Sequence, residues 1–325
     1  MLKVGVPAWI DDELMAKFPR EIELVRIASA PTQDVDVEFW VAPTSAKGFK
    51  QALPHVKGVR VIQAMLAGID WLRHLVPHGI TLCDGQGMHN IPTAEWTVTA
   101  ILSSLKYFPF YRDLQHAGEW QRLTEADAIY RAMNPGAATT FKVLQEELYG
   151  KRVMIVGYGS IGRSIEERLL AFGAEIVRVA RQAREAPDGN KVESIDSLPR
   201  LLPHADVIVL IVPLTEETTG MIGAKELALL KQGALLVNAA RGPIVQTDAL
   251  VEALQSGRIR AALDVTDPEP LPKDHPLWSA PNLLITPHIA GSSPRSMERA
   301  ICFAAEQVAR YLRGEELKNI VAGNY

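Results

Sequence analysis

Short apolar runs alternate with segments of helical periodicity from the N-terminus to about residue 91. The apolar runs predict five strands, at residues 2–6, 23–27, 37–42, 60–65 and 80–83. Two of the segments between them, 11–18 and 45–53, predict helices. This alternation is typical of a parallel sheet covered by helices.

A second unit with the same alternation begins near residue 149. Its apolar runs are nearly continuous, and they predict strands at residues 151–156, 175–180, 207–212, 234–238, 260–265 and 283–285. Helical periodicity follows at 163–172, 225–230 and 247–256. Continuous apolar strands fit burial on both faces, so we predict a doubly wound sheet.

Three further segments complete the predicted organisation. Residues 92–107 predict a long helix, because Pro92 and Thr93 are helix entry signals. The amphipathic run 296–312 predicts a last helix that returns to the first unit. The region 108–148 is less regular and rich in aromatic and charged residues, and we interpret it either as an arm packing on another subunit or as a surface excursion.

Composition narrows the classes of partner. The chain of 325 residues is 47% hydrophobic and 22% charged, which is enough to bury a sizeable core. The formal net charge is −4 and Lys and Arg form no long block, so we expect neither nucleic acid nor an anionic membrane as partner. Cys83 and Cys302 are too few for a disulfide framework, and we interpret them as free core thiols in a reducing compartment.

The same sequence gives no sign of export or of a membrane span. Residues 1–6 enter a strand-like run without the apolar segment and cleavage site of a signal peptide. The longest strongly apolar run, 207–212, is far shorter than the roughly 20 residues that cross a bilayer. We therefore expect a cytoplasmic protein.

A glycine-rich turn follows the first strand of the second unit. Gly157, Gly159 and Gly162 form a G-x-G-x-x-G pattern between that strand and a helix. The first glycine permits a tight turn, the second lets a pyrophosphate approach the backbone, and the third allows the helix to pack closely on the strand. Free N–H groups at the start of the helix would meet the phosphates, so the pattern predicts a dinucleotide site.

The end of the next strand indicates which dinucleotide is bound. Strands at this place usually end in an acidic residue that binds the ribose hydroxyls of NAD. Here residues 177–184 hold no Asp or Glu, and Arg181 is suited to bind a 2′-phosphate. We therefore predict NADP in preference to NAD, with solvated surface arginines as the alternative interpretation.

Three later strand ends carry side chains suited to proton and anion chemistry. Arg241, Glu269 and His288 follow successive predicted strands, whose ends converge at one edge of a doubly wound sheet. Imidazole exchanges protons near neutral pH, and a carboxylate beside it orients the ring. A guanidinium binds a carboxylate and a keto oxygen with two prongs. Together they predict oxidation of an alcohol beside a carboxylate, although singly each residue also fits a purely structural role.

A turn in the first unit is a second candidate for anion binding. Residues 63–70 follow a predicted strand and include the small residues Ala67 and Gly68, whose amides would be exposed. Ligands of open α/β sheets bind outside the carboxyl ends of strands. These amides are therefore candidates to hold a small anion.

Five ordered blocks of the sequence resemble the D-isomer-specific 2-hydroxyacid dehydrogenase family, over nearly the whole chain. The matching stretches are 148–151 ahead of the glycine turn, 212–215 with Thr218, 237–242, 263–265 with 268–271, and 286–291. The resemblance implies a flavodoxin-like substrate domain at 1–92 and 289–325 and a Rossmann NAD(P)-binding domain at 93–288. It implies that the region around 107–148 joins two subunits into a homodimer.

The resemblance also implies a role for each site residue. Arg241 would bind the substrate carboxylate and carbonyl together with the amides of Ala67 and Gly68, Glu269 would tune the histidine, and His288 would be the acid/base. No metal site is implied. The implied cofactor-binding residues are Gly157, Gly159, Ser160, Ile161, Gly162, Arg181, Val212, Pro213, Thr218, Ala239, Ala240, Arg241, Asp264, His288 and Gly291, with Asp264 near the nicotinamide carboxamide.

Departures from the family pattern bear on cofactor and substrate. Ala180 stands where NAD-dependent members have Asp. This departure supports NADP, as in the glyoxylate/hydroxypyruvate reductase branch. His89 and Asn90 stand where relatives often carry a differently placed Asn, and the loop 66–68 lacks a bulky or charged selector. The sequence thus predicts an NAD(P)-dependent reductase of small 2-oxoacids.

Two alternatives share this scaffold. The first is a formate or phosphite dehydrogenase, although the formate branch has Gln where Glu269 stands and a longer N-terminal region. The second is a dinucleotide-sensing corepressor, which needs a peptide groove on the first domain and usually an extended disordered tail.

Overall fold

The computed structural model describes residues 1–120, 122–137 and 139–321. The chain divides into two compact units: unit 1 comprises Met1–Asn90 and Gly291–Tyr325, and unit 2 comprises Ile91–Ala290. Each unit boundary lies two residues from the one predicted at 1–92, 93–288 and 289–325. Unit 2 is thus inserted into unit 1, which is assembled from both ends of the chain.

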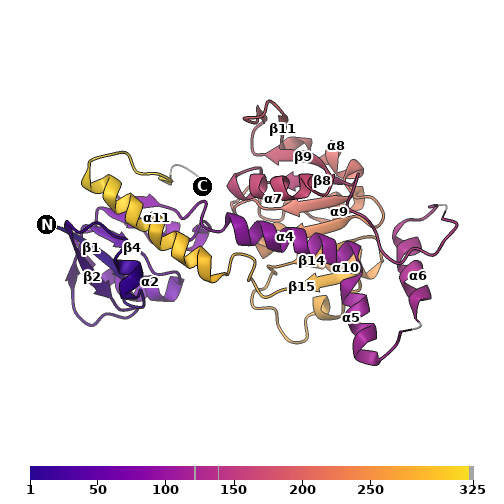
Figure 1. Cartoon of the computed structure of the whole chain (residues 1–325), viewed down its shortest axis with the longest axis horizontal. Helices are drawn as coiled ribbons and strands as arrows, with labels where there is room; N and C mark the ends of the chain where they lie inside the picture. The colour runs from indigo at the N-terminus through magenta and orange to yellow at the C-terminus, as the bar shows by residue number, and fades with distance from the viewer. Residues whose placement is uncertain (121, 138, 322–325) are drawn as a thin grey trace. The chain divides into compact units, whose positions relative to one another are not determined.

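The described residues of unit 1 form a five-stranded parallel sheet in the order β2-β1-β4-β6-β7, with a separate two-stranded pair, β3-β5 (Figure 1). This is the flavodoxin-like arrangement, in which the chain turns in opposite directions on either side of the first strand. The strands are β1 (Leu2–Pro7), β2 (Ile22–Ile27), β3 (Val35–Asp36), β4 (Phe39–Val41), β5 (Val56–Lys57), β6 (Val61–Gln63) and β7 (Thr81–Cys83). The helices are α1 (Asp12–Met15), α2 (Ala46–Ala52), α3 (Asp70–Arg73) and α11 (Pro294–Leu312).

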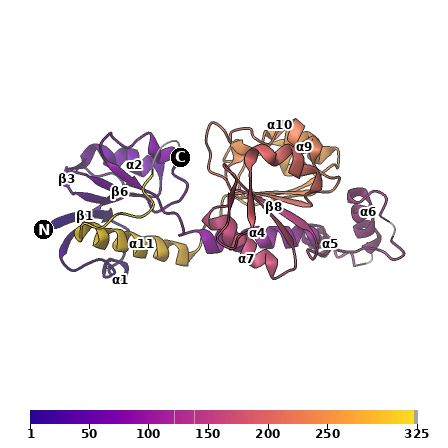
Figure 2. The same cartoon turned by 90° about the horizontal axis from the view of Figure 1, so that it is seen from above.

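Helices cover both faces of this sheet. Figure 2 shows α11 and α1 on one face and α2 on the other. The apolar stripe of α11, including Ile301 and Val308, packs in one cluster with Val4 and Phe39 of the sheet. The last helix also makes polar contacts with unit 1, since the Gln307 amide donates to the Gln63 side chain at 3.1 Å. The predicted helix 296–312 therefore does return to the first unit.

The described part of unit 2 contains an eight-stranded sheet in the order β10-β11-β9-β8-β12-β13-β14-β15, parallel except for the edge strand β10. Its strands are β8 (Arg152–Val156), β9 (Glu175–Ala180), β10 (Arg184–Glu185), β11 (Lys191–Ser194), β12 (Val207–Leu210), β13 (Leu235–Asn238), β14 (Arg260–Leu263) and β15 (Leu283–Ile285). Its helices are α4 (Asn90–Leu105), α5 (Phe108–Ala117), α6 (Leu123–Met133), α7 (Ser160–Leu170), α8 (Leu198–Leu201), α9 (Ala224–Leu229) and α10 (Thr247–Gln255).

The central strands of unit 2 are buried on both faces, as their continuous apolar runs predict. Figure 2 shows α4 and α7 on one face of the sheet and α9 and α10 on the other. Alternate residues of one strand face opposite layers: Val207 and Val209 pack with α4 and α7, whereas Ile208 and Leu210 pack with α9 and α10. The predicted fold class, α/β with two doubly wound parallel-sheet domains, is confirmed.

The region 108–148 is more regular than predicted, because it contains α5 and α6. Helix α5 has Pro109 in its first turn and ends at Gly118 in the left-handed conformation, which are ordinary helix start and stop signals. The end of α6 packs on its own unit. A Cβ on Gly233 would lie 2.2 Å from the carbonyl oxygen of Met133, so the two backbones are in close contact.

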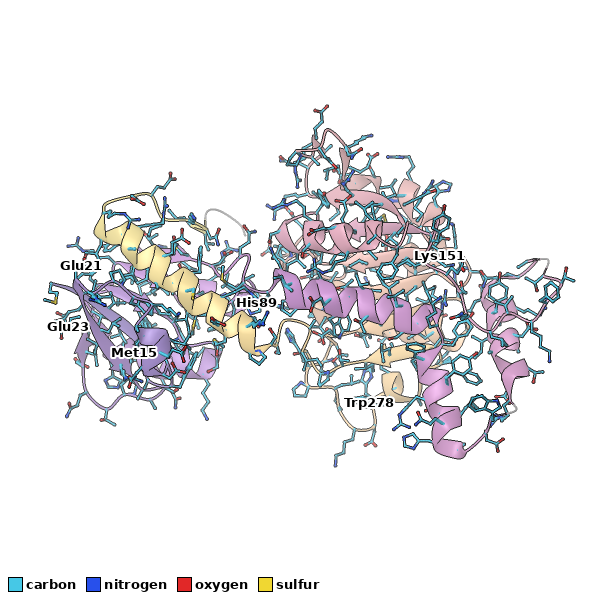
Figure 3. The ribbon with its side chains drawn as sticks, in the orientation of Figure 1. Met15, Glu21, Glu23, His89, Lys151 and Trp278 are labelled. Carbon is cyan, nitrogen blue, oxygen red and sulfur yellow. The ribbon has the colours of Figure 1, made fainter. Side chains whose placement is uncertain are left out.

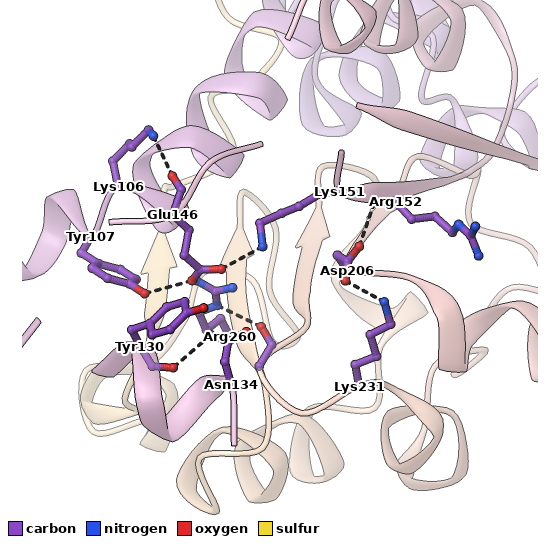
Figure 4. Close-up of polar contacts among 11 residues, drawn as sticks. Lys106, Tyr107, Tyr130, Asn134, Glu146, Lys151, Arg152, Asp206, Lys231 and Arg260 are labelled. Carbon is purple, nitrogen blue, oxygen red and sulfur yellow. Dashed lines mark hydrogen bonds and ion pairs between the residues drawn. The ribbon is translucent and has the colours of Figure 1, made fainter. Parts of the chain in front are cut away.

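A buried carboxylate fixes the end of this region to the amino edge of the unit 2 sheet. Glu146 accepts hydrogen bonds from the Tyr107 hydroxyl at 2.9 Å, from Arg260 at 2.8 Å and from Lys151 at 2.8 Å (Figure 4). Burial alone raises the pKa of the Glu146 carboxyl, but Arg260 and Lys151 outweigh it and hold that pKa below its ordinary value. Both ends of the α5–α6 segment are thereby tied to one charge network.

One prediction about the cysteines is wrong. Cys83 is buried at the end of β7, as expected of a core thiol, whereas Cys302 is exposed on α11. The apolar stripe of that helix is formed by other residues of the same turn, such as Ile301. Within the described ranges, no helix combines the length and apolar character needed to cross a membrane.

Candidate functional site

Six strand ends of unit 2 lie at one edge of its sheet. Strands β9, β8, β12, β13, β14 and β15 are neighbours in that order and run parallel, so their carboxyl ends share this edge. Every predicted cofactor or catalytic residue of unit 2 lies in a segment that follows one of these strands. This is the edge at which open α/β sheets bind their ligands.

The glycine turn after β8 has the geometry that a dinucleotide requires. Gly157 has φ 110°, and a Cβ there would lie 2.4 Å from the carbonyl oxygen of Ile211. Gly162 is similarly enclosed, because its Cβ would lie 2.7 Å from the carbonyl oxygen of Gly157. Nothing lies within 4 Å of a Cβ placed on Gly159, which precedes the first residues of α7, Ser160 and Ile161. The turn is therefore closed against the protein at Gly157 and Gly162 and open at Gly159, the position predicted to meet a phosphate.

A cluster of polar side chains from the turn, α7 and β9 holds the glycine turn in place. Tyr158 donates to Glu166 of α7, and Arg178 of β9 pairs with the same carboxylate. The Arg178 guanidinium also lies 5.4 Å from the centre of the Tyr158 ring. From the β10–β11 hairpin, Arg184 donates to the Tyr158 carbonyl at 2.7 Å. Sequence reasoning missed this support, because Glu166 and Arg178 belong to no motif and lie within a helix and a strand.

Arg181 directly follows β9, as predicted, and its guanidinium Nε lies 3.5 Å from the Glu217 carboxylate. Glu217 belongs to a turn after β12 that also contains the predicted residues Val212, Pro213 and Thr218. The buried Thr218 hydroxyl donates to the Pro213 carbonyl at 2.7 Å and accepts from the Thr215 amide at 2.8 Å. The turn after β12 is thus internally braced.

The segment after β13 is braced by the buried residue Asn238. Its side-chain amide donates to the Arg241 carbonyl at 2.9 Å, and its side-chain oxygen accepts from the Ala240 amide at 3.1 Å, across Ala239. A Cβ on Gly242 would lie 1.9 Å from the Thr266 carbonyl oxygen, so this segment packs directly on the segment after β14. The Arg241 backbone is therefore held beside the strand end that leads to Glu269.

Asp264, at the end of β14, binds the backbone of the segment after β15. Its buried carboxylate accepts from the amides of Ile289 and Ala290, each at 2.8 Å, and from the Thr286 hydroxyl at 2.6 Å. The Thr286 hydroxyl in turn accepts from the Trp96 indole at 3.0 Å. One carboxylate thus fixes the backbone on both sides of His288.

His288 and Glu269 are brought together as predicted. The His288 ring Nδ1 lies 2.6 Å from the Glu269 carboxylate, and the His288 amide donates to the Asp264 carbonyl at 2.7 Å. A carboxylate only accepts, so Nδ1 carries a proton and Nε2 is the nitrogen available to a ligand. Both side chains are about two-fifths exposed. A half-exposed imidazole oriented by a carboxylate is suited to proton exchange with a small molecule.

The remaining predicted residues lie in unit 1. Ala67 and Gly68 follow β6 at the carboxyl edge of the unit 1 sheet, and the Leu66 carbonyl accepts from the Gly85 amide at 2.9 Å. Gly291 is the first residue of unit 1 after the insertion, and a Cβ there would lie 3.0 Å from the ring of His89 (Figure 3). Burial lowers the pKa of His89, and Arg299 lowers it further. His89 is therefore a mainly neutral side chain at physiological pH.

Comparison with known proteins agrees with this geometry. The family model of the D-isomer specific 2-hydroxyacid dehydrogenase NAD binding domain matches residues 98–290. The chain is 34% identical to a glyoxylate reductase of Aeropyrum pernix, over 81% of this chain and 76% of that protein. It is 32% identical to a D-3-phosphoglycerate dehydrogenase of Methanocaldococcus jannaschii, over 99% of this chain but only 59% of that longer protein.

A solved structure extends the likeness to the whole fold. The D-isomer specific 2-hydroxyacid dehydrogenase of Xanthobacter autotrophicus Py2, in complex with NADPH and MES, superposes with a TM-score of 0.77 at 25% identity. The superposition covers 98% of each chain.

Proposed function

The chain belongs to the D-isomer specific 2-hydroxyacid dehydrogenase family of NAD(P)-dependent oxidoreductases, and from this premise we propose that it reduces a small 2-oxoacid such as glyoxylate or hydroxypyruvate. The matches to the family model and to the glyoxylate reductase confirm the predicted family and enzyme class. The substrate, the cofactor preference and the roles of the site residues are proposals. The observation that carries the proposal is the 2.6 Å contact between His288 and Glu269 at the ligand-binding edge of unit 2.

His288 is the proposed proton donor to the keto oxygen. Glu269 holds its Nδ1 proton, so the exchanged proton is the one on Nε2. In the reverse direction, His288 takes the hydroxyl proton of the 2-hydroxyacid. Asp264 supports this exchange by fixing the backbone on both sides of the ring.

Arg241 is the proposed ligand of the substrate carboxylate and keto oxygen. Its guanidinium offers paired donors, which match two oxygen atoms and stabilise charge that develops on the keto oxygen. The amides of Ala67 and Gly68 are proposed to hold the other side of the carboxylate. The loop 66–68 presents no charged side chain, which supports a small, uncharged group on the substrate carbon chain.

The residues of unit 2 fit a dinucleotide. The glycine turn leaves open space only where a phosphate would approach, at Gly159. When bound, the reduced nicotinamide supplies the hydride that the keto carbon receives. We propose that the residues of the six strand ends line its site: Gly157, Gly159, Ser160, Ile161, Gly162, Arg181, Val212, Pro213, Thr218, Ala239, Ala240, Arg241, Asp264 and His288, with Gly291 from unit 1.

NADP is the preferred form in this proposal. Ala180 ends β9 without a carboxylate, and Arg181 follows it with a fixed positive charge. The crystallised relative from Xanthobacter autotrophicus holds NADPH, which supports the same choice. We further propose a cytoplasmic homodimer that joins through the region 107–148 and has no nucleic-acid partner.

The proposal is tested by following NADPH and NADH oxidation with glyoxylate, hydroxypyruvate and larger 2-oxoacids, and NAD(P) reduction with formate and phosphite. We expect turnover of the smallest 2-oxoacids with NADPH and its loss in the His288→Ala variant. Turnover of formate or phosphite alone would establish the alternative enzyme. Undiminished turnover by the variant would remove His288 from the mechanism.

A further inference from the structure

Two exposed side chains of opposite charge meet beside the glycine turn. Arg181 follows β9 and Glu217 lies in the turn after β12, and the two strands are the neighbours of β8 on its two sides. Their ion pair, 3.5 Å from Nε to Oε2, therefore joins the segments on either side of the strand that carries the glycine turn. A 2′-phosphate bound by Arg181 has to take the place of this partner.

The Glu217 side of the pair is held in position by its turn. Besides the bonds of Thr218, the Thr218 amide donates to the Thr215 hydroxyl at 3.3 Å, and the Thr219 amide donates to the Thr215 carbonyl at 3.0 Å. The Arg181 side is held through its backbone, because the Ser194 hydroxyl donates to the Arg181 carbonyl at 3.3 Å. The backbone beneath each charge is thus held in place, and only the two side-chain ends have to move.

The pair is weak enough to exchange. The side chains are 53% and 74% exposed, and exposed ion pairs of this kind contribute little, because water screens both charges. A phosphate monoester carries more charge than a carboxylate and offers three acceptor oxygens, so it is the stronger partner for a guanidinium. The ribose of NAD has only hydroxyl groups at this place and offers no competing charge.

We propose that Glu217 is the resident counter-ion of Arg181, which the 2′-phosphate of NADP displaces and which NAD leaves in place. Displaced Glu217 stays anchored by its turn close to the phosphate and repels it. Glu217 is thus a specificity-determining residue that lowers the affinity for NADP without contributing to the chemical step. The inference rests on the proposed function, in that it takes Arg181 as the 2′-phosphate ligand.

The test measures binding of two probes to the full chain by titration calorimetry: adenosine 2′,5′-bisphosphate, which has the 2′-phosphate, and 5′-AMP, which lacks it. We expect Glu217→Gln to tighten the bisphosphate about three- to five-fold, the effect of removing an exposed pair, and to leave 5′-AMP within about two-fold. Glu216→Gln removes the same charge from the neighbouring position and is the matched control, with a smaller effect on both probes.

A double-substitution cycle shows whether Glu217 acts through Arg181. In an Arg181→Ala background, the Glu217→Gln effect on bisphosphate binding should shrink to the size of the Glu216→Gln effect. If the wild type prefers the bisphosphate and Glu217→Gln leaves that preference unchanged, the role of Glu217 is overturned and the NADP preference stands. Equal binding of both probes by both proteins overturns the NADP preference as well. Selective loss of 5′-AMP binding in Glu217→Gln would instead make Glu217 a ligand of the ribose hydroxyls.

Discussion

Hydrogen bonds at and beside the backbone of His288 hold this residue in place more than the contacts of its ring do. It has a left-handed conformation with φ 53°, uncommon for a residue other than glycine, and the bonds to Asp264 on both sides maintain it. This arrangement presents the ring at a strand end, where Glu269 orients it. Replacing the ring should therefore remove the chemistry and leave the backbone in place.

The corresponding prediction concerns His288→Ala. We expect kcat to fall about 10²- to 10⁴-fold, the usual contribution of a general acid. The dissociation constant of NADPH should change much less than kcat, although His288 is one of the residues proposed to line the cofactor site. Steady-state kinetics and cofactor titration check the two parts, and a loss of both turnover and cofactor binding would contradict a role limited to proton transfer.

Asp84, which follows β7 in unit 1, predicts a pH dependence of stability. Burial raises the pKa of its carboxyl to about 6, against a smaller lowering effect of the hydrogen bond from the Gln86 amide. The folded protein therefore keeps a proton that the unfolded chain releases near pH 4, and stability falls as the pH rises from about 4 to about 6.

Asp84→Asn should remove this dependence. Its side-chain oxygen can still accept from Gln86, and near neutral pH we expect a gain of about 1–3 kcal/mol in the free energy of unfolding. Below about pH 4 the gain should vanish, since both proteins are then uncharged at this position. Urea unfolding across this range measures the difference, and a gain that does not vary with pH would contradict the explanation.

The convergence of the proposed catalytic residues on one sheet edge was predictable at the residue scale, because adjacent parallel strands bring their ends together whatever the side chains do. Arg241, Glu269 and His288 needed only the strand order. The contacts of Glu166 with Tyr158 and Arg178 were not predictable, since they depend on how α7 packs on β9. The ion pair of Arg181 with Glu217 was not predictable either, because Glu217 lies 36 residues further along the chain.

At the scale of elements, two glycines of the turn have different roles: we expect Gly157 to be needed for folding and Gly159 for dinucleotide binding. Gly157→Ala puts a Cβ 2.4 Å from a backbone oxygen at φ 110°, so we expect unit 2 to be strongly destabilised. Gly159→Ala puts a methyl group into open space at an ordinary φ of −100°. This second variant should keep its melting temperature within a few degrees and lose most of its dinucleotide affinity.

Differential scanning calorimetry with and without NADPH distinguishes the two variants. Gly159→Ala should melt like the wild type when no cofactor is added, and it should gain much less on addition of NADPH. A Gly159→Ala protein that NADPH stabilises as much as the wild type would show that the pyrophosphate does not approach this position. Gly157→Ala is the control that loses stability in both conditions.

Strands and helices were predicted best where many of their residues are buried. Strands β9 and β15 have the bounds that their apolar runs predict. The run 207–212 ends its strand at Leu210, since residues 211–218 leave the sheet for the turn that holds Glu217. Strands β10 and β11 were missed because residues 184–194 are mostly polar and edge strands need few apolar residues. Helices α5 and α6 were missed because few of their described residues are buried, such as Leu114 in α5 and Met133 in α6.

Exposed aromatic residues of the region 108–148 matter at the scale of the whole molecule. Trp120 and Phe141 are each 83% exposed, and Phe108 is 59% exposed, all within the region proposed to join two subunits. Large apolar side chains exposed on this one segment support the proposed subunit interface. The Glu146 network fixes both ends of this segment to unit 2, so the surface is presented by an anchored element rather than by a free loop.

The proposed dimer predicts a mass near twice the 35.7 kDa of one chain in analytical ultracentrifugation. Phe141→Asp with Trp120→Asp should shift the protein to the monomer mass, because two charges would be buried without partners. Trp9→Asp, which changes an exposed aromatic residue of unit 1, is the matched control and should leave the mass unchanged. A wild-type monomer would reject the dimer and leave the surface to another partner.

The insertion of unit 2 into unit 1 has a consequence for the order of folding during synthesis. The sheet of unit 1 is complete once residue 90 has left the ribosome, but the helix that covers one of its faces, α11, begins only at Pro294. Unit 2 has all of its strands by then and can fold as each is made. The nascent chain therefore carries a half-covered sheet through the synthesis of some two hundred residues. Release of the last helix from the ribosome is the step that completes unit 1.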